Sequence, residues 1–180
     1  QNHWELLIWN TKDNQLTEVI QEGSETYIDI NDQLTVIPGS STFLYLSDIS
    51  GYRHIYAYDY KKNQVSQITS GFWQVNKILA YRPKTKNIFY PSTETSTLED
   101  HVFQIKIDGK NKKSVLNQPA LSGNEYAICS REAQWMYIIN SSMAGTPHYK
   151  TCLLGDKFKY VHTDTNFSKK VTAMNLSEVV

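Results

Sequence analysis

Residues 43–70, FLYLSDISGYRHIYAYDYKKNQVSQITS, decide the fold of this chain. Apolar, aromatic and β-branched residues gather there in three runs: Phe43–Ser47, His54–Tyr60 and Val65–Thr69. Two polar segments, at 48–51 and 61–64, separate the runs, and the first of them contains a glycine. Runs of this length and composition, divided by turn residues, predict three antiparallel strands joined by short turns.

The same unit recurs along the chain. It is marked by four histidines that open comparable runs at intervals of 51, 47 and 47 residues: His3, His54, His101 and His148. A preceding run recurs as well, as FLYLS from Phe43, IFYPS from Ile88 and MYIINS from Met136. A period of about 45–50 residues with four short strands per unit is typical of a β-propeller blade, which is a four-stranded antiparallel sheet.

The repeat predicts an all-β fold, a partial β-propeller of about three and a half four-stranded antiparallel blades. We expect the outer half of a blade at residues 1–25, whole blades at 26–71, 72–118 and 119–163, and an exit segment at 164–180. Residues 75–81 are expected to form a strand, and Ser92–Asp100 a polar loop. The chain opens as if inside a strand, so we expect a piece of a longer protein. Its unpaired blade faces would be exposed, which predicts self-association.

Composition excludes several classes of protein. Eighteen basic residues balance eighteen acidic ones, and no basic stripe is visible, which argues against a nucleic-acid partner. No run of 18 apolar residues exists, so no membrane span is expected. Cys129 and Cys152 fall in two runs with a third between them, about 9–10 Å apart if the strands pair in order. That separation is too long for a disulfide, so two thiols are expected.

The repeated histidines suggest a metal site or a structural role. Equivalent positions in successive blades lie about 10 Å or more apart, whereas the ligands of one metal must meet within a few ångströms. We therefore expect each histidine to open the third strand of its blade and to hydrogen-bond to a neighbouring turn or strand. His162 stands outside this repeat.

Other candidate site residues have a structural reading that we prefer. Glu99 and Asp100 are expected to solvate a loop, and Asp32 of the pair Asp29/Asp32 to cap a turn. No G-x-S-x-G motif, phosphate-binding loop or calcium loop occurs, so no catalytic, cofactor-binding or metal-binding residue is assigned. Three asparagines stand in N-x-S sequons, which chance explains in a chain this rich in Asn and Ser: Asn140, Asn166 and Asn175.

Two adjoining segments resemble the propeller of the dipeptidyl peptidase IV family. They are GYRHIY at Gly51–Tyr56 and QITSGFWQV at Gln67–Val75. The first six residues, QNHWEL, and YIDIND at Tyr27–Asp32 are similar to further segments of bacterial members. Glu94–His101 is similar to the family's E-x-S-P-x-E-R-H loop, from which it departs at Thr97, where Pro is usual, and at Asp100, where Arg is usual.

The resemblance implies a function for a larger protein. Family members are serine exopeptidases that release Xaa-Pro or Xaa-Ala dipeptides from peptide N-termini, and their eight-bladed propeller covers an α/β-hydrolase domain that follows it in the chain. This chain would then be non-catalytic, with the hydrolase domain and the remaining blades as its partners and peptides as substrates of the parent. A periplasmic, cell-surface or secreted address is implied too. The alternative is a stand-alone propeller that binds protein or glycan ligands.

Overall fold

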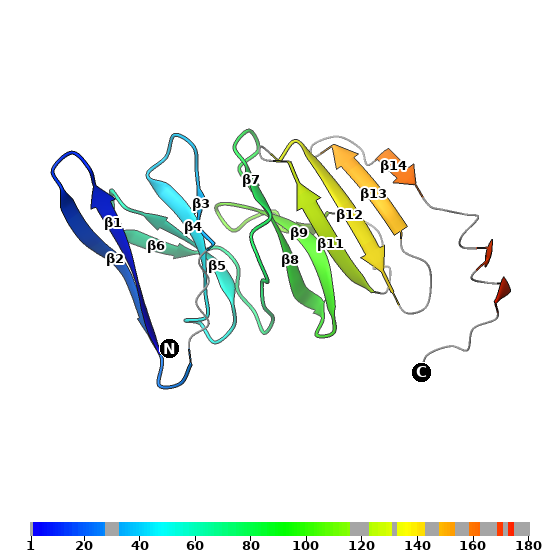
Figure 1. The fold of residues 1–180 in the computed structure, drawn as a ribbon, viewed down its shortest axis with the longest axis horizontal. Helices are drawn as coiled ribbons and strands as arrows, with labels where there is room; N and C mark the ends of the chain where they lie inside the picture. The colour runs from blue at the N-terminus through cyan, green and yellow to red at the C-terminus, as the bar shows by residue number, and fades with distance from the viewer. Residues whose placement is uncertain are drawn as a thin grey trace.

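The structure is a computed structural model that describes residues 2–27, 33–115, 123–130, 133–142, 148–153, 159–162, 169–170 and 173–174. These residues form four antiparallel sheets, which follow one another from the N-terminus to the C-terminus in Figure 1. Each whole sheet has four strands whose order in space is their order in the chain. This meander of antiparallel strands is the arrangement expected of propeller blades.

The first sheet is a hairpin of β1 (His3–Asn10) and β2 (Gln15–Gly23). The second sheet contains β3 (Thr35–Val36), β4 (Thr42–Ser47), β5 (His54–Asp59) and β6 (Gln64–Gln67). The third contains β7 (Ala80–Arg82), β8 (Asn87–Ser96), β9 (Glu99–Lys106) and β10 (Lys113–Ser114). The fourth contains β11 (Asn124–Cys129), β12 (Trp135–Ser141), β13 (His148–Leu153) and β14 (Lys159–His162).

The central strands of the second and third sheets are buried on both faces. In β4, every residue from Phe43 to Ser47 is buried, and the same holds for His54–Tyr58 of β5. Side chains on a strand point alternately to opposite faces, so each of these sheets must be covered on both sides. The sequences of these strands therefore lack the alternation of apolar and polar residues that is typical of a sheet with one exposed face.

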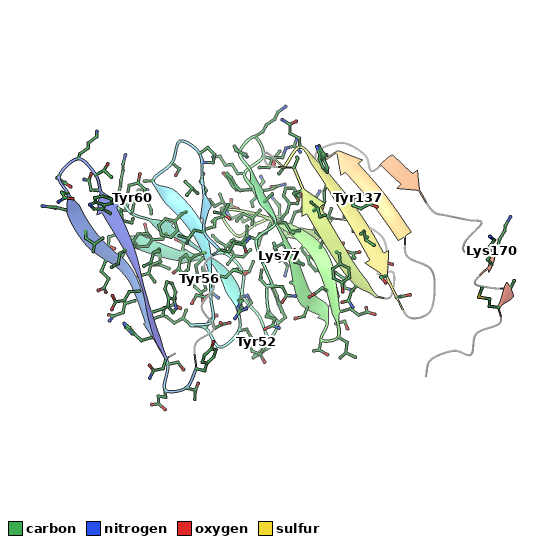
Figure 2. The ribbon with its side chains drawn as sticks, in the orientation of Figure 1. Tyr52, Tyr56, Tyr60, Lys77, Tyr137 and Lys170 are labelled. Atoms are coloured by element: carbon green, nitrogen blue, oxygen red, sulfur yellow. The ribbon has the colours of Figure 1, made fainter. Side chains whose placement is uncertain are left out.

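Three apolar clusters fill the spaces between successive sheets. Phe43, Tyr45, Tyr56 and Tyr58 pack against the β1–β2 hairpin with its Ile20. The opposite face of the same sheet, with Leu44 and Ile55, packs against Ile88 and Tyr90 of the third sheet. A third cluster joins Phe89 and Val102 of the third sheet to Met136 and Ile138 of the fourth. The chain is thus held together sheet against sheet, and the side chains in these spaces are drawn in Figure 2.

Two expectations about the third sheet are wrong. Ser92–Asp100 is not a loop, because β8 continues to Ser96 and β9 begins at Glu99, leaving only Thr97 and Leu98 in the turn. The strands were not recognised because the side chains of Ser92–Asp100 are mostly polar. The strand register shifts between Ser92 and Ser96. The strand expected at 75–81 is reduced to β7, while Val75 makes an isolated bridge to Ser92.

The last residues contribute little regular structure to the described part of the chain. The N–H of Met174 donates to the carbonyl of Lys170 at 3.2 Å, which is the hydrogen bond of a helical turn. Asp29, Asp32, Asn166 and Asn175 lie outside the described residues. No helix among the residues described is long and apolar enough to cross a membrane.

Candidate functional site

The histidines of the repeat stand opposite buried polar residues of the preceding strand. His54 pairs with Ser47, His101 with Ser92, and His148 with Asn140. Ser47, Ser92 and Asn140 are all buried. Each whole sheet therefore carries a polar pair between its second and third strands. The pairing partner could have been found in the sequence, because each second-strand run closes on polar residues: Ser47, Ser92 and Asn140–Ser141.

His54 is held in a complete hydrogen-bond network. Its Nε2 lies 3.1 Å from the carbonyl oxygen of Gly71, which can only accept, so Nε2 carries the proton. Its Nδ1 then accepts from the hydroxyl of Thr69 at 3.2 Å, and that hydroxyl accepts from the N–H of Ile55 at 2.9 Å. The Trp73 ring meets the imidazole edge-on, 4.8 Å away. The expected structural role of this histidine is confirmed.

The ring nitrogens of His101 face carboxylates instead of a hydroxyl and a carbonyl. Its Nε2 lies 3.3 Å from Glu99, and its Nδ1 lies 3.7 Å from Glu125, which belongs to the next sheet. Glu125 also accepts from the N–H of Val102 at 2.8 Å, and Glu99 accepts from the N–H of Gly123 at 2.6 Å. Histidine and Glu125 side chains are both only 4% exposed. These contacts fasten β9 to the start of the fourth sheet.

The interpretation of Glu99 and Asp100 as solvating residues is therefore wrong. Glu99 accepts the backbone N–H of Gly123, which directly precedes the next sheet, as described above. Asp100 accepts from the amide of Asn76 at 2.6 Å, and its own N–H donates to the side chain of Asn124 at 2.8 Å. Both carboxylates join separate segments because the strands continue to the turn and bring the segments together.

The described residues contain no group of three or more His, Cys, Asp or Glu that could hold a metal ion. Neither His54 nor His101 is hydrogen-bonded to a serine or cysteine within the described part of the chain, as a nucleophile and its base would be. His3 is exposed and contacts Glu5 at 2.9 Å. The side chains of His148 and His162 lie outside what the structure describes.

Two further sets of residues singled out in the sequence have defined places. Met136 stands between the cysteines, opposite Cys129 on one side and Cys152 on the other, so they occupy non-neighbouring strands as expected. Asn140 is 2% exposed, and a glycosylated asparagine must be accessible at the surface. The remaining cysteine prediction, that both stay thiols, is still a prediction.

The histidine pairs lie near one end of the sheets, which we call the loop end. It comprises five segments: Gly23–Tyr27, Asp48–Arg53, Gly71–Asn76, Thr93–Asp100 and Gly123–Asn124. Backbone hydrogen bonds connect them, from the N–H of Val75 to the carbonyl of Arg53 at 2.8 Å and from the N–H of Thr93 to that of Gln74 at 3.2 Å. Alternate connections of an antiparallel meander share an end, which explains why these segments meet.

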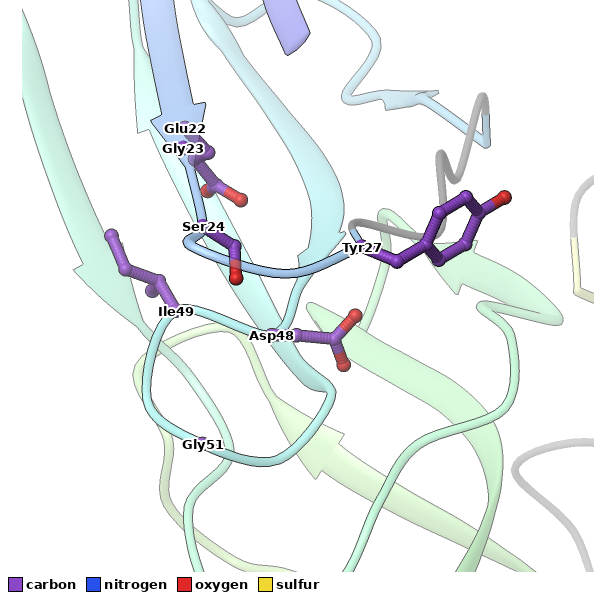
Figure 3. Close-up of a pocket in the computed structure, with 7 residues that line it drawn as sticks. All are labelled: Glu22, Gly23, Ser24, Tyr27, Asp48, Ile49 and Gly51. Carbon is purple, nitrogen blue, oxygen red and sulfur yellow. The ribbon is translucent and has the colours of Figure 1, made fainter. Parts of the chain in front are cut away.

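A cleft of about 270 Å³ opens at the loop end beside the β1–β2 hairpin. Figure 3 shows the seven lining residues: Glu22, Gly23, Ser24, Tyr27, Asp48, Ile49 and Gly51. Burial raises the pKa of Glu22, aided by the charge of Asp48 and opposed by hydrogen bonds from Ser47 and Trp4. Asp48 is paired with Arg53 at 3.1 Å. The cleft therefore has one carboxylate, Asp48, that is paired with an arginine, and another, Glu22, that is partly buried.

A second, more polar cleft of about 230 Å³ lies between the third and fourth sheets. Asn76, Thr93, Glu99, Asp100 and Asn124 are among its lining residues. Many of these polar groups are already bonded to one another, as described above. The cleft therefore offers hydrogen-bonding edges to a visiting chain.

Apolar side chains project from the loop end beside the clefts. Phe72 is 90% exposed and Leu98 is 86% exposed. Tyr27, Ile49 and Tyr52 are exposed too, and the ring of Tyr52 meets that of Phe72 edge-on at 6.1 Å. Exposed apolar residues gathered on one surface mark a site of contact with another molecule or domain. The loop end is suited to binding and positioning, and sequence analysis missed it because its members are far apart in the chain.

We expect the stability of the chain to fall when the pH is lowered through the ordinary pKa of histidine. Burial lowers the pKa of His54 below its usual value of 6.5, opposed by the Gly71 carbonyl and by the charges of Asp48 and Glu94. The unfolded chain therefore takes up this proton first, and stability is lost from about pH 6.5 downward until the folded histidine also titrates. The loss is at most about 1.4 kcal/mol per pH unit.

The measurement is the free energy of unfolding in urea between pH 7.5 and 5.5. His54→Gln should remove this part of the pH dependence, while His3→Gln, a change at an exposed histidine, should retain it. An equally steep decline in His54→Gln and in the parent chain would show that His54 is not its source.

Comparison with known proteins supports the sequence resemblance. Residues 1–148 match the family described as the dipeptidyl peptidase IV (DPP IV) N-terminal region. Dipeptidyl peptidase 4 of Arthroderma otae is 26% identical over 155 residues, and that of Trichophyton rubrum 27% over 156 residues. Each comparison covers 83% of this chain and 20% of the relative. The chain thus spans about a fifth of the length of these relatives.

Solved structures show the same fold. The crystal structure of Porphyromonas gingivalis dipeptidyl peptidase 4 superposes with a TM-score of 0.81 and 24% identity, over 96% of this chain and 24% of that one. A putative dipeptidyl aminopeptidase IV from Bacteroides ovatus gives a TM-score of 0.73 and 18% identity, over 88% and 25%. The all-β, partial propeller fold is confirmed. On the match over residues 1–148, the chain belongs to the dipeptidyl peptidase IV N-terminal region family.

Proposed function

We propose that this chain is a non-catalytic part of the β-propeller of a dipeptidyl peptidase IV-like serine peptidase. The parent would have eight blades and a hydrolase domain, and it would release Xaa-Pro or Xaa-Ala dipeptides from peptide N-termini. The observation that carries the proposal is the family match over residues 1–148. Two features of the structure support the proposal. The buried His54 and His101 hydrogen-bond to or contact groups that hold the strands in place, and the loop end exposes apolar side chains that another domain could cover.

In this proposal the loop end faces the hydrolase domain and helps to scaffold it and gate access to it. The exposed side chains of Phe72 and Leu98 would be covered by that domain, because apolar surface of this kind is stabilised by burial. The two clefts beside them would border the path of peptide substrates. An exported parent, located in the periplasm, at the cell surface or outside the cell, is part of the same proposal.

The whole encoded protein should hydrolyse Gly-Pro and Ala-Pro p-nitroanilides, whereas the 180-residue chain alone should not. We expect the activity in the periplasmic, cell-surface or secreted fraction of the source cells. The measurement is the release of p-nitroaniline by each fraction and by the two purified proteins. A coding sequence that ends shortly after Val180, or a whole protein without this activity, would favour a stand-alone binding module instead. Activity confined to the cytoplasm would contradict the proposed address.

Replacing the exposed side chains of Phe72 and Leu98 should lower the activity or heat stability of the whole protein and leave the stability of the isolated chain almost unchanged. For Phe72→Ser/Leu98→Ser, the unfolding free energy of the chain should change by no more than about 0.5 kcal/mol per site, as is usual for exposed positions. The whole protein should lose kcat/KM several-fold or inactivate at a lower temperature. Tyr60→Ser/Val65→Ser is the matched control, since both residues are about half exposed at the opposite end of the second sheet. Equal effects of the two double variants would argue against the loop end as the domain contact.

The isolated chain should self-associate through its N-terminal hairpin. Within the described residues β1 pairs only with β2, and the outer face of the hairpin exposes Leu7, Trp9 and Leu16. Light scattering should give a mass above the 20.8 kDa of one chain. Trp9→Ser/Leu16→Ser should shift the mass toward the monomer, and Tyr60→Ser/Val65→Ser should not. If the unsubstituted 180-residue chain is monomeric at high micromolar concentration, the expectation is wrong.

A further inference from the structure

Basic residues are concentrated in two turns of the third sheet. Residues 82–87, from the end of β7 to the start of β8, and residues 106–113, from the end of β9 to the start of β10, hold seven of the 18 Lys and Arg residues of the chain. They contain a single acidic residue, Asp108. The chain as a whole has no net charge, so this concentration is a local property of the sheet.

The backbone joins the two turns into one surface. The N–H of Ile107 donates to the carbonyl of Lys86 at 2.9 Å, and Asn87 stands opposite Lys106 in the ladder. The N–H of Lys106 in turn donates to the carbonyl of Lys110 at 2.9 Å. We call the resulting set the basic surface: Arg82, Lys84, Lys86, Lys106 and Lys110. The turn between β7 and β8 projects from the tip of the third sheet in Figure 1.

The charges of the basic surface are not used inside the chain. None of its five side chains takes part in an ion pair or a side-chain hydrogen bond within the described residues, and none lines either cleft of the loop end. Lys112 differs from them, because it is paired with Glu94 and lies over the Trp73 ring. Asp108 accepts the N–H of Lys110 at 3.0 Å through its side chain. Three of the five residues, Lys84, Lys86 and Lys110, are exposed, and the other two are half-buried. Asp108 is the one carboxylate among them.

The backbone of Lys86 provides an independent observation. Its φ is 57°, in the left-handed region that lysine seldom occupies. Asparagine, which tolerates this conformation better, takes it in three other turns of the chain: Asn14, Asn63 and Asn111. The third sheet thus accepts backbone strain at the position where it carries a lysine. Strain of this kind is often found where a side chain has a task outside the fold.

From this surface we propose that the chain binds the phosphate headgroups of an anionic phospholipid membrane. The cations stand on two turns and at the strand ends that flank them, and none lines either cleft of the loop end, which suits a flat layer of charge better than a single polymer strand. Four of the five are lysines, whose compact charge acts without the paired geometry that arginine offers to individual phosphates. Neither turn contains an aromatic residue on which a nucleic-acid base could stack.

The test is sedimentation of the chain with phosphatidylcholine vesicles that contain 30 mol% phosphatidylglycerol. We expect binding to these vesicles in 50 mM NaCl, much weaker binding in 300 mM NaCl, and none to pure phosphatidylcholine. Each cation near such a surface contributes about a fivefold increase in affinity, so Lys84→Gln/Lys86→Asn/Lys106→Gln should weaken binding about 100-fold. Lys86→Asn also places asparagine at the left-handed position, so the triple variant is expected to fold.

Lys12→Gln/Lys61→Gln/Lys77→Gln is the matched control, because it removes the same charge from three exposed lysines elsewhere. It should retain most of the binding. Equal losses in both triple variants, or no binding by the parent chain, would overturn the proposal. So would binding to single-stranded DNA or heparin that is at least as tight as vesicle binding and is lost in the first triple variant, since the surface would then recognise a polyanion. Circular dichroism of each variant checks that the fold is retained.

Discussion

The structure depends on burial of each central strand pair on both faces. A sheet such as β3–β6 cannot be stable with only one covered side, because residues of β4 and β5 bury apolar side chains toward both neighbours. The neighbouring sheets cover these two faces, so each sheet depends for its stability on the sheets before and after it. The same requirement leaves a sheet at either end with less cover, as the exposed outer face of the first hairpin shows.

Buried sheets create a second requirement, which is to satisfy polar groups where the strands begin. The N–H after the repeated histidine finds its acceptor in two ways. Ile55 uses Thr69, which lies just after β6 of its own sheet, and Val102 uses Glu125 of the next sheet. The first solution closes a sheet on itself and the second ties two sheets together. An identical position in the repeat therefore has a local role in one sheet and a joining role in the other, because buried groups must be paired whatever supplies the partner.

The sequence predicted the sheets well because their signal is local. Runs such as Phe43–Ser47 and His54–Tyr60 carry their strand propensity with them, and the histidine interval fixes their order. The arm at Ser92–Asp100 was mistaken for a loop since Thr93 and Glu94 are polar, and their strand is stabilised by pairing with distant residues. The loop end could not be predicted at all. Phe72 and Leu98 are ordinary apolar residues in the sequence, and only the meeting of separate connections makes them one surface.

Charge illustrates the same limit of sequence analysis. Equal numbers of acidic and basic residues suggest an electrically featureless protein. In the folded chain, however, Asp48, Glu99 and Asp100 belong to the loop end, while Lys84 and Lys106 lie at the opposite end of the third sheet. An antiparallel meander sorts its connections alternately to two ends, so any bias between odd and even connections becomes a charge difference between two faces. A neutral composition can therefore conceal two surfaces that favour opposite partners.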